Sequence, residues 1–240
     1  RCDRLFLSPR ADGKIHRLRG AEGVPADQDL VVRAATLLKQ QTGCSSGVDI
    51  ELEKRLPMGG GLGGGSSNAA TTLLALNQLW SLQLGIDALA ELGLQLGADV
   101  PVFVRGQAAW AEGVGEELTP VDLPCPHYLV LRPPVGVSTA RIFHDALLTR
   151  DSPAATMVDF LAGDDRNDCL ERVLALYPDV ANAYDWLNQQ TQGRARLTGT
   201  GCCVFSALDD REQGQMLAEQ ADPKLEAFVA RGLNRSPLFG

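Results

Sequence analysis

A glycine-rich segment contains the residue types and spacing in this sequence that most clearly suggest chemistry. Residues 57–68 read PMGGGLGGGSSN, with six glycines among the seven positions from Gly59 to Gly65. A backbone without side chains lets many N–H groups approach one ligand closely. The hydroxyls of Ser66 and Ser67, at the expected start of a helix, add capping groups and the positive end of the helix dipole. The segment therefore predicts a phosphate-binding site.

The sequence on either side of this segment argues against the alternative of a flexible glycine linker. Upstream, Val48, Ile50 and Leu52 alternate with acidic residues, which is the period of a half-buried strand. Downstream, AATTLLALNQLW has the apolar stripe of a helix. Ordered flanks are not typical of Gly/Ser linkers. We therefore expect a strand over 48–54, a glycine-rich turn and a helix over 67–80.

Spacing separates the segment from two other phosphate-binding motifs. The Walker A motif requires Lys and then Ser or Thr after its last glycine, whereas Gly64 is followed by Gly65. Gly59, Gly61 and Gly64 match G-x-G-x-x-G, but so many glycines make that match uninformative. A dinucleotide fold also needs an acidic residue about 20 residues further on, after a second strand. The candidate, Asp87, instead opens a predicted helix over 87–96.

The segment resembles the phosphate loop of the GHMP small-molecule kinases, with Pro57 before it and two serines and Asn68 after it. Further segments resemble that family in the family's order: LGADVP at 96–101, AEGVGE at 111–116, LTP at 118–120 and LTGTG at 197–201. Together they are similar to the branch that acts on a cytidine diphosphate-linked methylerythritol. The resemblance implies an α+β, two-lobed GHMP kinase fold with the active site in the cleft between lobes.

The resemblance also implies the chemistry, which is transfer of a phosphoryl group from ATP, with Mg2+, to the 2-hydroxyl of that small-molecule substrate. From sequence alone, Asp99 is better interpreted as the cap of a short helix. The matching family context reverses this, and the resemblance implies that Asp99 orients and deprotonates the hydroxyl. The implied ATP-binding residues are Pro57, Met58, Gly59, Gly60, Gly61, Leu62, Gly63, Gly64, Gly65, Ser66 and Ser67.

Three residues are implied to lie near the substrate. Val114 and Thr139 match positions close to it, and Phe143 matches an aromatic that clamps the cytosine ring. The alternative for Phe143 is a buried core residue. Gly199 and Gly201 are expected to let the C-terminal backbone approach the site closely.

The N-terminal region departs from the family pattern. Family members begin with a strand carrying a Pro-Ala-Lys-Leu-Asn type motif and then an aromatic-His pair, and neither occurs here. We therefore expect a fragment without that strand and its active-site lysine, and a first hairpin turning at Asp12-Gly13. Two other functions stay open: another GHMP kinase acting on a different small alcohol, and a nucleotide-binding module without catalysis.

Composition bounds the remaining possibilities. The 240 residues suit one large domain or two small ones; we expect an N-terminal ATP-binding lobe at 1–122 and a C-terminal lobe at 123–240. A net charge of −8 without a basic cluster argues against a nucleic-acid partner. No apolar run approaches the roughly 20 residues of a membrane span. We expect a cytoplasmic protein without a membrane partner, and leave its oligomeric state open.

The six cysteines show neither CxxC spacing nor paired histidines, which argues against a zinc site, and no other metal site is predicted. We expect them to be reduced and mostly buried. Asp27 or Asp29 is expected to cap a helix that ends at Gly43. The other expected elements are a hairpin at 102–121, a strand at 128–131 and helices at 168–176, 179–190 and 210–220.

Overall fold

The computed structural model describes residues 1–239, and these form two compact units. The first unit contains Arg1–Leu56, Gly63–Leu123 and the residues from Leu233 on; the second contains Pro57–Leu62 and Pro124–Gly232. The sequence predicted two lobes, each one continuous stretch of chain, at 1–122 and 123–240. The compact units differ from them in two segments, because the first half of the glycine segment packs with the second unit and the C-terminal residues pack with the first.

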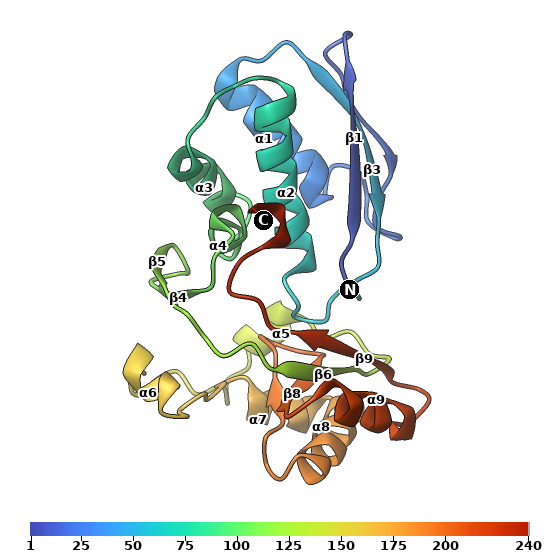
Figure 1. Cartoon of the computed structure of the whole chain (residues 1–240), viewed down its shortest axis with the longest axis vertical. Helices are drawn as coiled ribbons and strands as arrows, with labels where there is room; N and C mark the ends of the chain where they lie inside the picture. Colours follow the sequence, from blue (N-terminus) through green and yellow to red (C-terminus); the bar gives the residue numbers. More distant parts are fainter. Residues whose placement is uncertain (240) are drawn as a thin grey trace. The chain divides into compact units, whose positions relative to one another are not determined.

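The first unit contains a mixed three-stranded sheet. In it, β3 (Gly47–Glu53) lies between β1 (Arg4–Arg10) and β2 (Ile15–Arg19), antiparallel to β1 and parallel to β2 (Figure 1). The expected hairpin of the first two strands is therefore wrong. The reason is that β3 carries the more apolar face, with Val48, Ile50 and Leu52 buried, and takes the central position.

Four helices accompany this sheet. They are α1 (Leu30–Thr42), α2 (Gly64–Leu79), α3 (Ile86–Leu94) and α4 (Val100–Arg105). The α1 boundaries confirm the sequence signals: the Asp29 side chain accepts a hydrogen bond from Val31 N, and Gly43 ends the helix with a φ of 64°. The core of the unit joins residues of helices and sheet, among them Val31, Leu38, Ile50, Leu73, Leu76, Val100 and Val104.

The segment expected as a hairpin at 102–121 begins instead as a helix. Pro101 lies in the first turn of α4 and Gly106 ends it with a φ of 64°. Only the later residues form a hairpin, from β4 (Ala109–Glu112) and β5 (Glu117–Pro120).

The second unit is built on an antiparallel sheet in the order β7-β8-β6-β9. Its strands are β6 (His127–Arg132), β7 (Arg196–Leu197), β8 (Val204–Leu208) and β9 (Glu226–Arg231). Its helices are α5 (Thr139–Phe143), α6 (Met157–Leu161), α7 (Leu170–Leu176), α8 (Pro178–Gln190) and α9 (Arg211–Gln220). The expected strand at 128–131 and helices at 168–176, 179–190 and 210–220 are confirmed to within about two residues, the usual uncertainty of element ends.

The last strand and the residues after it were not expected from the sequence. β9 pairs with β6 along its whole length. The chain then returns to the first unit, where the Asn234 side chain bonds both the N–H and the carbonyl of Leu123, at 3.0 and 2.8 Å. A short helix, η1 (Pro237–Phe239), follows. These pairings join residues far apart in sequence, so no local pattern predicts them.

Of the six cysteines, only Cys202 and Cys203 are buried; Cys44, Cys125 and Cys169 are half-buried and Cys2 is exposed. The expectation of mostly buried cysteines is therefore wrong. No helix among residues 1–239 combines the length and the apolar character needed to cross a membrane.

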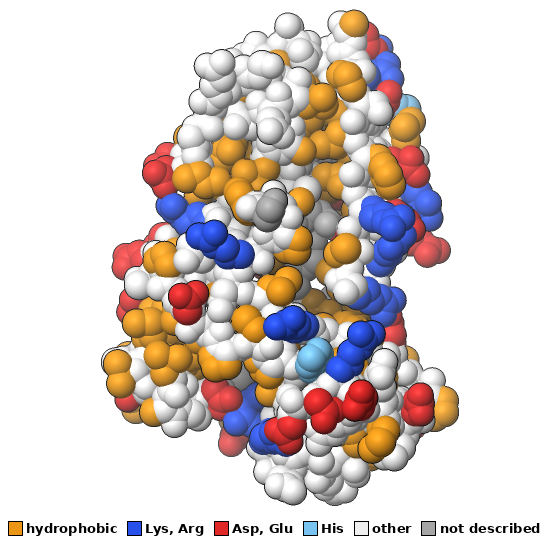
Figure 2. Space-filling model, in the orientation of Figure 1, with side chains coloured by type: hydrophobic (Ala, Val, Ile, Leu, Met, Phe, Trp, Pro, Cys, Tyr) orange, Lys and Arg blue, Asp and Glu red, His pale blue; other side chains and the backbone are white. Residues whose placement is uncertain are grey.

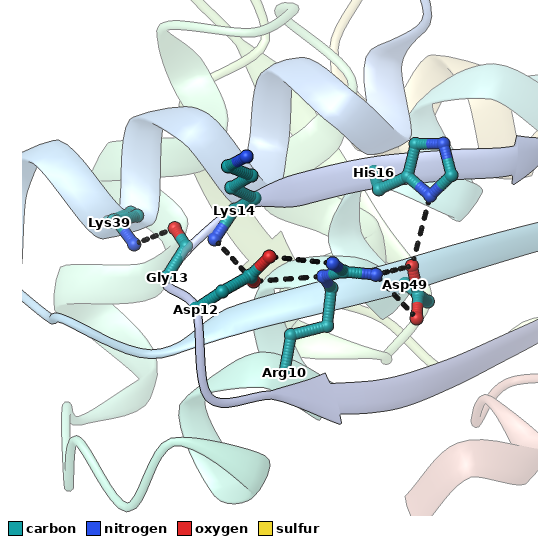
Figure 3. A network of polar contacts seen from close by, with 7 residues as sticks. All are labelled: Arg10, Asp12, Gly13, Lys14, His16, Lys39 and Asp49. Carbon is teal, nitrogen blue, oxygen red and sulfur yellow. Dashed lines mark hydrogen bonds and ion pairs between the residues drawn. The ribbon is translucent and has the colours of Figure 1, made fainter.

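A lysine ties the β1–β2 turn to the loop before β3. Lys39 of α1 donates from Nζ to the carbonyl of Gly13 (Figure 3). It also donates to the carbonyls of Ser45 and Ser46, the last at 2.8 Å. One ammonium thus satisfies three backbone acceptors from two loops.

Arg10, at the end of β1, bridges Asp12 and Asp49 on the sheet next to this turn (Figure 3). Its hydrogen bonds hold the pKa of Asp12 well below the usual range. Both sides of the turn are therefore fixed by charged groups, Lys39 on one and Arg10 on the other.

Replacing Lys39 by Met should lower the free energy of unfolding by about 1–3 kcal/mol, because the three carbonyls lose a charged donor. Urea denaturation would measure this. Lys14→Met is the matched control, because the exposed Lys14 side chain makes no hydrogen bond among residues 1–239. Equal losses in the two variants would contradict the assignment.

Candidate functional site

The first half of the glycine segment is hydrogen-bonded to the LTGTG motif and the two cysteines that follow it, within the second unit. Gly59 and Gly60 accept hydrogen bonds at their carbonyls from the N–H groups of Cys202 and Cys203, both at 3.3 Å. The Gly61 carbonyl accepts one from Thr198 Oγ1, 137 positions further along the chain, at 2.7 Å. Three successive carbonyls are thus held by residues from a distant part of the sequence.

This close approach explains part of the glycine content. A Cβ on Gly60 would lie 2.6 Å from Cys203 Sγ, and one on Gly61 would overlap the carbonyl oxygen of Thr198. Gly61 also has a φ of 72°, which disfavours other residues. These glycines are therefore required for packing as well as for any ligand.

The second half of the segment belongs to the first unit and forms the start of α2. Gly63, with a φ of 64°, precedes the helix, and the first intrahelical bond runs from Ser67 N to Gly63 O at 2.8 Å. The N–H groups of Gly64, Gly65 and Ser66 therefore have no partner within the helix. Together with the dipole of a 16-residue helix, they form an arrangement suited to an anion.

The expected helix start at residue 67, with the two serines as caps, is wrong. Ser66, Ser67 and Asn68 lie inside α2, and no side chain caps this helix. The physical reason is that Gly63 adopts the left-handed turn that lets the helix begin three residues earlier. Asn68 instead donates from Nδ2 to Asp3 Oδ2 at 2.8 Å.

Asp99 lies beside this helix start. A Cβ on Gly63 would be 3.7 Å from Asp99 Oδ2, and one on Gly97 would be 3.3 Å from Oδ1 and 3.9 Å from Ser66 Oγ. The carboxylate therefore faces the end of the glycine segment across Gly63 and Gly97, within the same unit.

Asp99 occupies the N-terminal position of α4, but its side chain does not cap that helix. It is exposed and makes no hydrogen bond with any residue of the described chain. The helix-cap interpretation of Asp99 is therefore wrong, and the carboxylate is left available to a ligand.

Val114 lies in the turn between β4 and β5, with 72% of its surface exposed. Its N–H donates to Glu116 Oε2 at 2.7 Å. A Cβ on the next residue, Gly115, would be 2.8 Å from the carbonyl oxygen of Ala98. The turn therefore packs against the residue before Asp99, although the substrate contact of Val114 stays a prediction.

Thr139 and Phe143 are the first and last residues of α5 in the second unit. The hydroxyls of Thr139 and Thr200 lie 2.8 Å apart, which links this helix to the LTGTG motif. Phe143 is 52% exposed, so its interpretation as a core residue is wrong. Exposed apolar side chains also gather on α6, where Val158 is 72% and Leu161 55% exposed. Figure 2 shows hydrophobic side chains on the surface in the part of the second unit where Figure 1 labels α6.

Sequence reasoning missed two polar residues that hold the site segments. Asn167 donates from Nδ2 to the carbonyls of Leu197 and Gly199, at 3.0 and 2.7 Å. Asp3 accepts hydrogen bonds around the start of the glycine segment. A lone Asn or Asp far from the motif carries no local signal of this kind.

We expect Gly60→Ala to lower the melting temperature, because the new Cβ would overlap Cys203 Sγ and overpacking costs about 1–3 kcal/mol. Gly60 does not have a positive φ, so removal of the sulfur in Gly60→Ala/Cys203→Ala should restore part of the loss. Thermal melts of both single variants and the double variant give the coupling. Gly136→Ala, at a glycine with open space around it, is the control, and additive effects would contradict the clash.

A family model supports the resemblance of these segments to known kinases. The model described as "GHMP kinases N terminal domain" matches residues 29–107. This range includes the strand β3, the glycine segment, α2 and Asp99.

Relatives cover nearly the whole chain. The 4-diphosphocytidyl-2-C-methyl-D-erythritol kinase of Pseudomonas syringae pv. syringae (strain B728a) is 56% identical over 236 residues, 98% of this chain and 83% of that protein. The kinase of the same name from Nitrosococcus oceani is 52% identical over 238 residues, 99% of this chain and 84% of that protein.

Solved structures agree in fold. A crystal structure of 4-(cytidine 5'-diphospho)-2C-methyl-D-erythritol kinase matches with a TM-score of 0.80 and 31% identity, over 96% of this chain and 86% of that one. A homoserine kinase from Cytophaga hutchinsonii matches with a TM-score of 0.70 at 17% identity, over 98% and 86%, which shows a common fold alone. The chain has the GHMP kinase fold and belongs to the 4-diphosphocytidyl-2-C-methyl-D-erythritol kinase family.

Proposed function

We propose that this chain transfers the γ-phosphoryl group of ATP to the 2-hydroxyl of 4-diphosphocytidyl-2-C-methyl-D-erythritol, in the cytoplasm, as a step of non-mevalonate isoprenoid precursor synthesis. The observation that carries the proposal is the Asp99 carboxylate, which has no partner in the described chain and faces Gly63 at the start of α2. The names of relatives at 52–56% identity support this acceptor.

The triphosphate is held by the segment from Pro57 to Ser67 in this proposal. The N–H groups of Gly64, Gly65 and Ser66 donate to phosphate oxygens, and the α2 dipole favours the negative charge. Binding at a helix end needs no basic cluster, which accords with a chain of net charge −8.

The donor set near α2 fits Mg2+, which prefers oxygen ligands. Ser66 Oγ lies next to Gly97, and this hydroxyl would hold the ion together with phosphate oxygens, which leaves the Asp99 carboxylate to act as the base. When bound, Mg2+ neutralises charge on the transferred phosphoryl group.

Asp99 accepts the proton of the acceptor hydroxyl. The hydroxyl oxygen then forms a bond to the γ-phosphorus, and the bond from that phosphorus to the bridging oxygen breaks to release ADP. Val114, next to Gly115 and Ala98, is proposed to contact the substrate near its reacting end. Thr139 and Phe143 are proposed to contact the cytidine end, with the exposed Phe143 ring stacking on the base.

The Asp99→Asn variant should lower kcat by about 10²–10⁴-fold, the usual contribution of a general base. ATP binding should persist, because Asn has nearly the same shape. The assay follows ADP release with Mg-ATP and the proposed acceptor, using protein expressed from its intact gene. A variant that kept wild-type kcat would contradict the role of Asp99.

Asp87→Asn is the matched control, since Asp87 is an exposed carboxylate whose partner is Arg105 at 2.8 Å; it should leave kcat unchanged. Two wild-type results separate the alternatives. Phosphorylation of homoserine instead would indicate another GHMP kinase, and ATP binding without turnover of any acceptor would indicate a binding module.

A further inference from the structure

A single carboxylate, that of Asp3, receives four hydrogen bonds at the start of the glycine segment. Its Oδ1 accepts from the N–H groups of Arg55 and Leu56, both at 2.7 Å. Its Oδ2 accepts from Asn68 Nδ2 at 2.8 Å and from Lys54 Nζ. Two backbone donors and two side-chain donors thus converge on one residue.

This carboxylate is buried and ionised. Only 3% of the Asp3 side chain is exposed, against 17% for Lys54. Burial alone would raise the pKa of Asp3, but the hydrogen bonds from Leu56, Lys54, Arg55 and Asn68 hold it below its usual range. A buried charge with all its donors in place stabilises one local geometry, whereas loss of any partner is costly.

The four donors come from both ends of the glycine segment. Lys54, Arg55 and Leu56 directly precede Pro57, and Asn68 lies in α2 directly after Ser67. The carboxylate therefore ties the entry of the segment to its exit within the first unit. This one contact fixes the distance in space between the two ends of the segment.

The Lys54 side chain runs along the helix start. A Cβ on Gly64 would lie 3.0 Å from Lys54 Nζ and 3.6 Å from Leu56 Cβ. The Lys54 ammonium, which is paired with Asp3, thus lies next to Gly64, the first residue of α2. The first N–H groups of this helix have no hydrogen-bond partner within it. A change at Asp3 would free this charge as well as the backbone of Arg55 and Leu56.

We propose that Asp3 is a positioning residue that holds the two ends of the glycine segment at a fixed distance, and so keeps the N–H groups of Gly64 to Ser66 aligned for the phosphates of ATP. The inference rests on the proposed function. It adds to that function a residue outside every motif, 52 positions before Arg55 in the sequence.

The test is Asp3→Asn, in the full-length protein expressed from its intact gene. Both carboxylate oxygens accept two hydrogen bonds, so the amide NH2 must face donors in either orientation. We expect the Kd for ATP, measured by calorimetry, and the KM for ATP to rise about tenfold, the effect of roughly 1.4 kcal/mol. The KM for the acceptor should change by less than about twofold, since its contacts are not altered.

A second variant can restore the contact. In Asp3→Asn/Asn68→Asp, the new amide oxygen at position 3 can accept from Arg55 and Leu56, while the amide NH2 donates to the carboxylate introduced at position 68, which also pairs with Lys54. We expect this exchange to return the Kd for ATP to within about threefold of wild type, as a coupled pair predicts. Asn68→Asp alone should be worse, because two carboxylates would then face each other.

A purely structural role is separated from a positioning role by Lys39→Met, which should lower stability in the same unit without touching the segment. All variants are measured well below their melting temperatures. If Asp3→Asn lowers the melting temperature as Lys39→Met does but leaves the Kd and KM for ATP unchanged, the inference is overturned. Failure of the exchange to restore binding would also overturn it.

Calorimetry with ATP alone keeps this test independent of the acceptor. If the wild-type protein binds ATP but does not phosphorylate the proposed acceptor, the proposed function fails while the comparison of Kd values still decides the role of Asp3. If the wild-type protein does not bind ATP, both proposals are wrong.

Discussion

The candidate site depends on the close approach of two backbone segments of the second unit, residues 59–61 and residues 198–203. Residues 59–61 offer three successive carbonyls to residues 198–203, at a separation that leaves no room for a Cβ on Gly60 or Gly61. The chain must then turn at Gly63 and begin α2 at once. The glycines therefore serve two purposes. Gly60 and Gly61 permit packing, and those after Leu62 leave helix N–H groups open to a ligand.

This division explains why the segment contains more glycine than the common phosphate-binding motifs. A motif that only cradles phosphate needs glycine where the ligand approaches. Here Gly60 and Gly61 are excluded from other identities by Cys203 and Thr198, residues of a distant motif. The LTGTG motif is in turn held by Asn167 and linked to Thr139. The two glycine motifs are therefore best understood as one structural arrangement.

The sequence predicted those parts of the fold that local physics determines. The helix cap, predicted at Asp27 or Asp29 and formed by Asp29, the stop at Gly43 and the alternation in β3 each lie within a few residues of the element they specify. The sequence did not predict the order β1-β3-β2 or the pairing of β9 with β6. Both depend on which of several distant strands pairs most favourably, and no local pattern contains that information. The helix start was misplaced for a related reason: the serines have good capping side chains, but Gly63 alone permits the required turn.

The candidate site shows the same distinction. The glycine segment and Asp99 were predictable because their residue types are unusual together and their order matches a family. Asp3 was not, because a single acidic residue in a strand-forming region has no distinctive pattern. Its importance arises only when Lys54, Arg55 and Asn68 are brought around it.

The position of Asp99 poses an electrostatic problem that the local structure addresses. A general base must lie near the acceptor hydroxyl, and in the proposed reaction that places its negative charge near the triphosphate, where the two repel. The carboxylate lies at the start of α2 and directly before α4, so the positive ends of two helices offset part of this repulsion. The absence of any hydrogen-bond partner within the described chain leaves its lone pairs free to receive a proton. By contrast, the carboxylate of Asp3 has every donor it can accept, which suits a residue that must hold a geometry and not react.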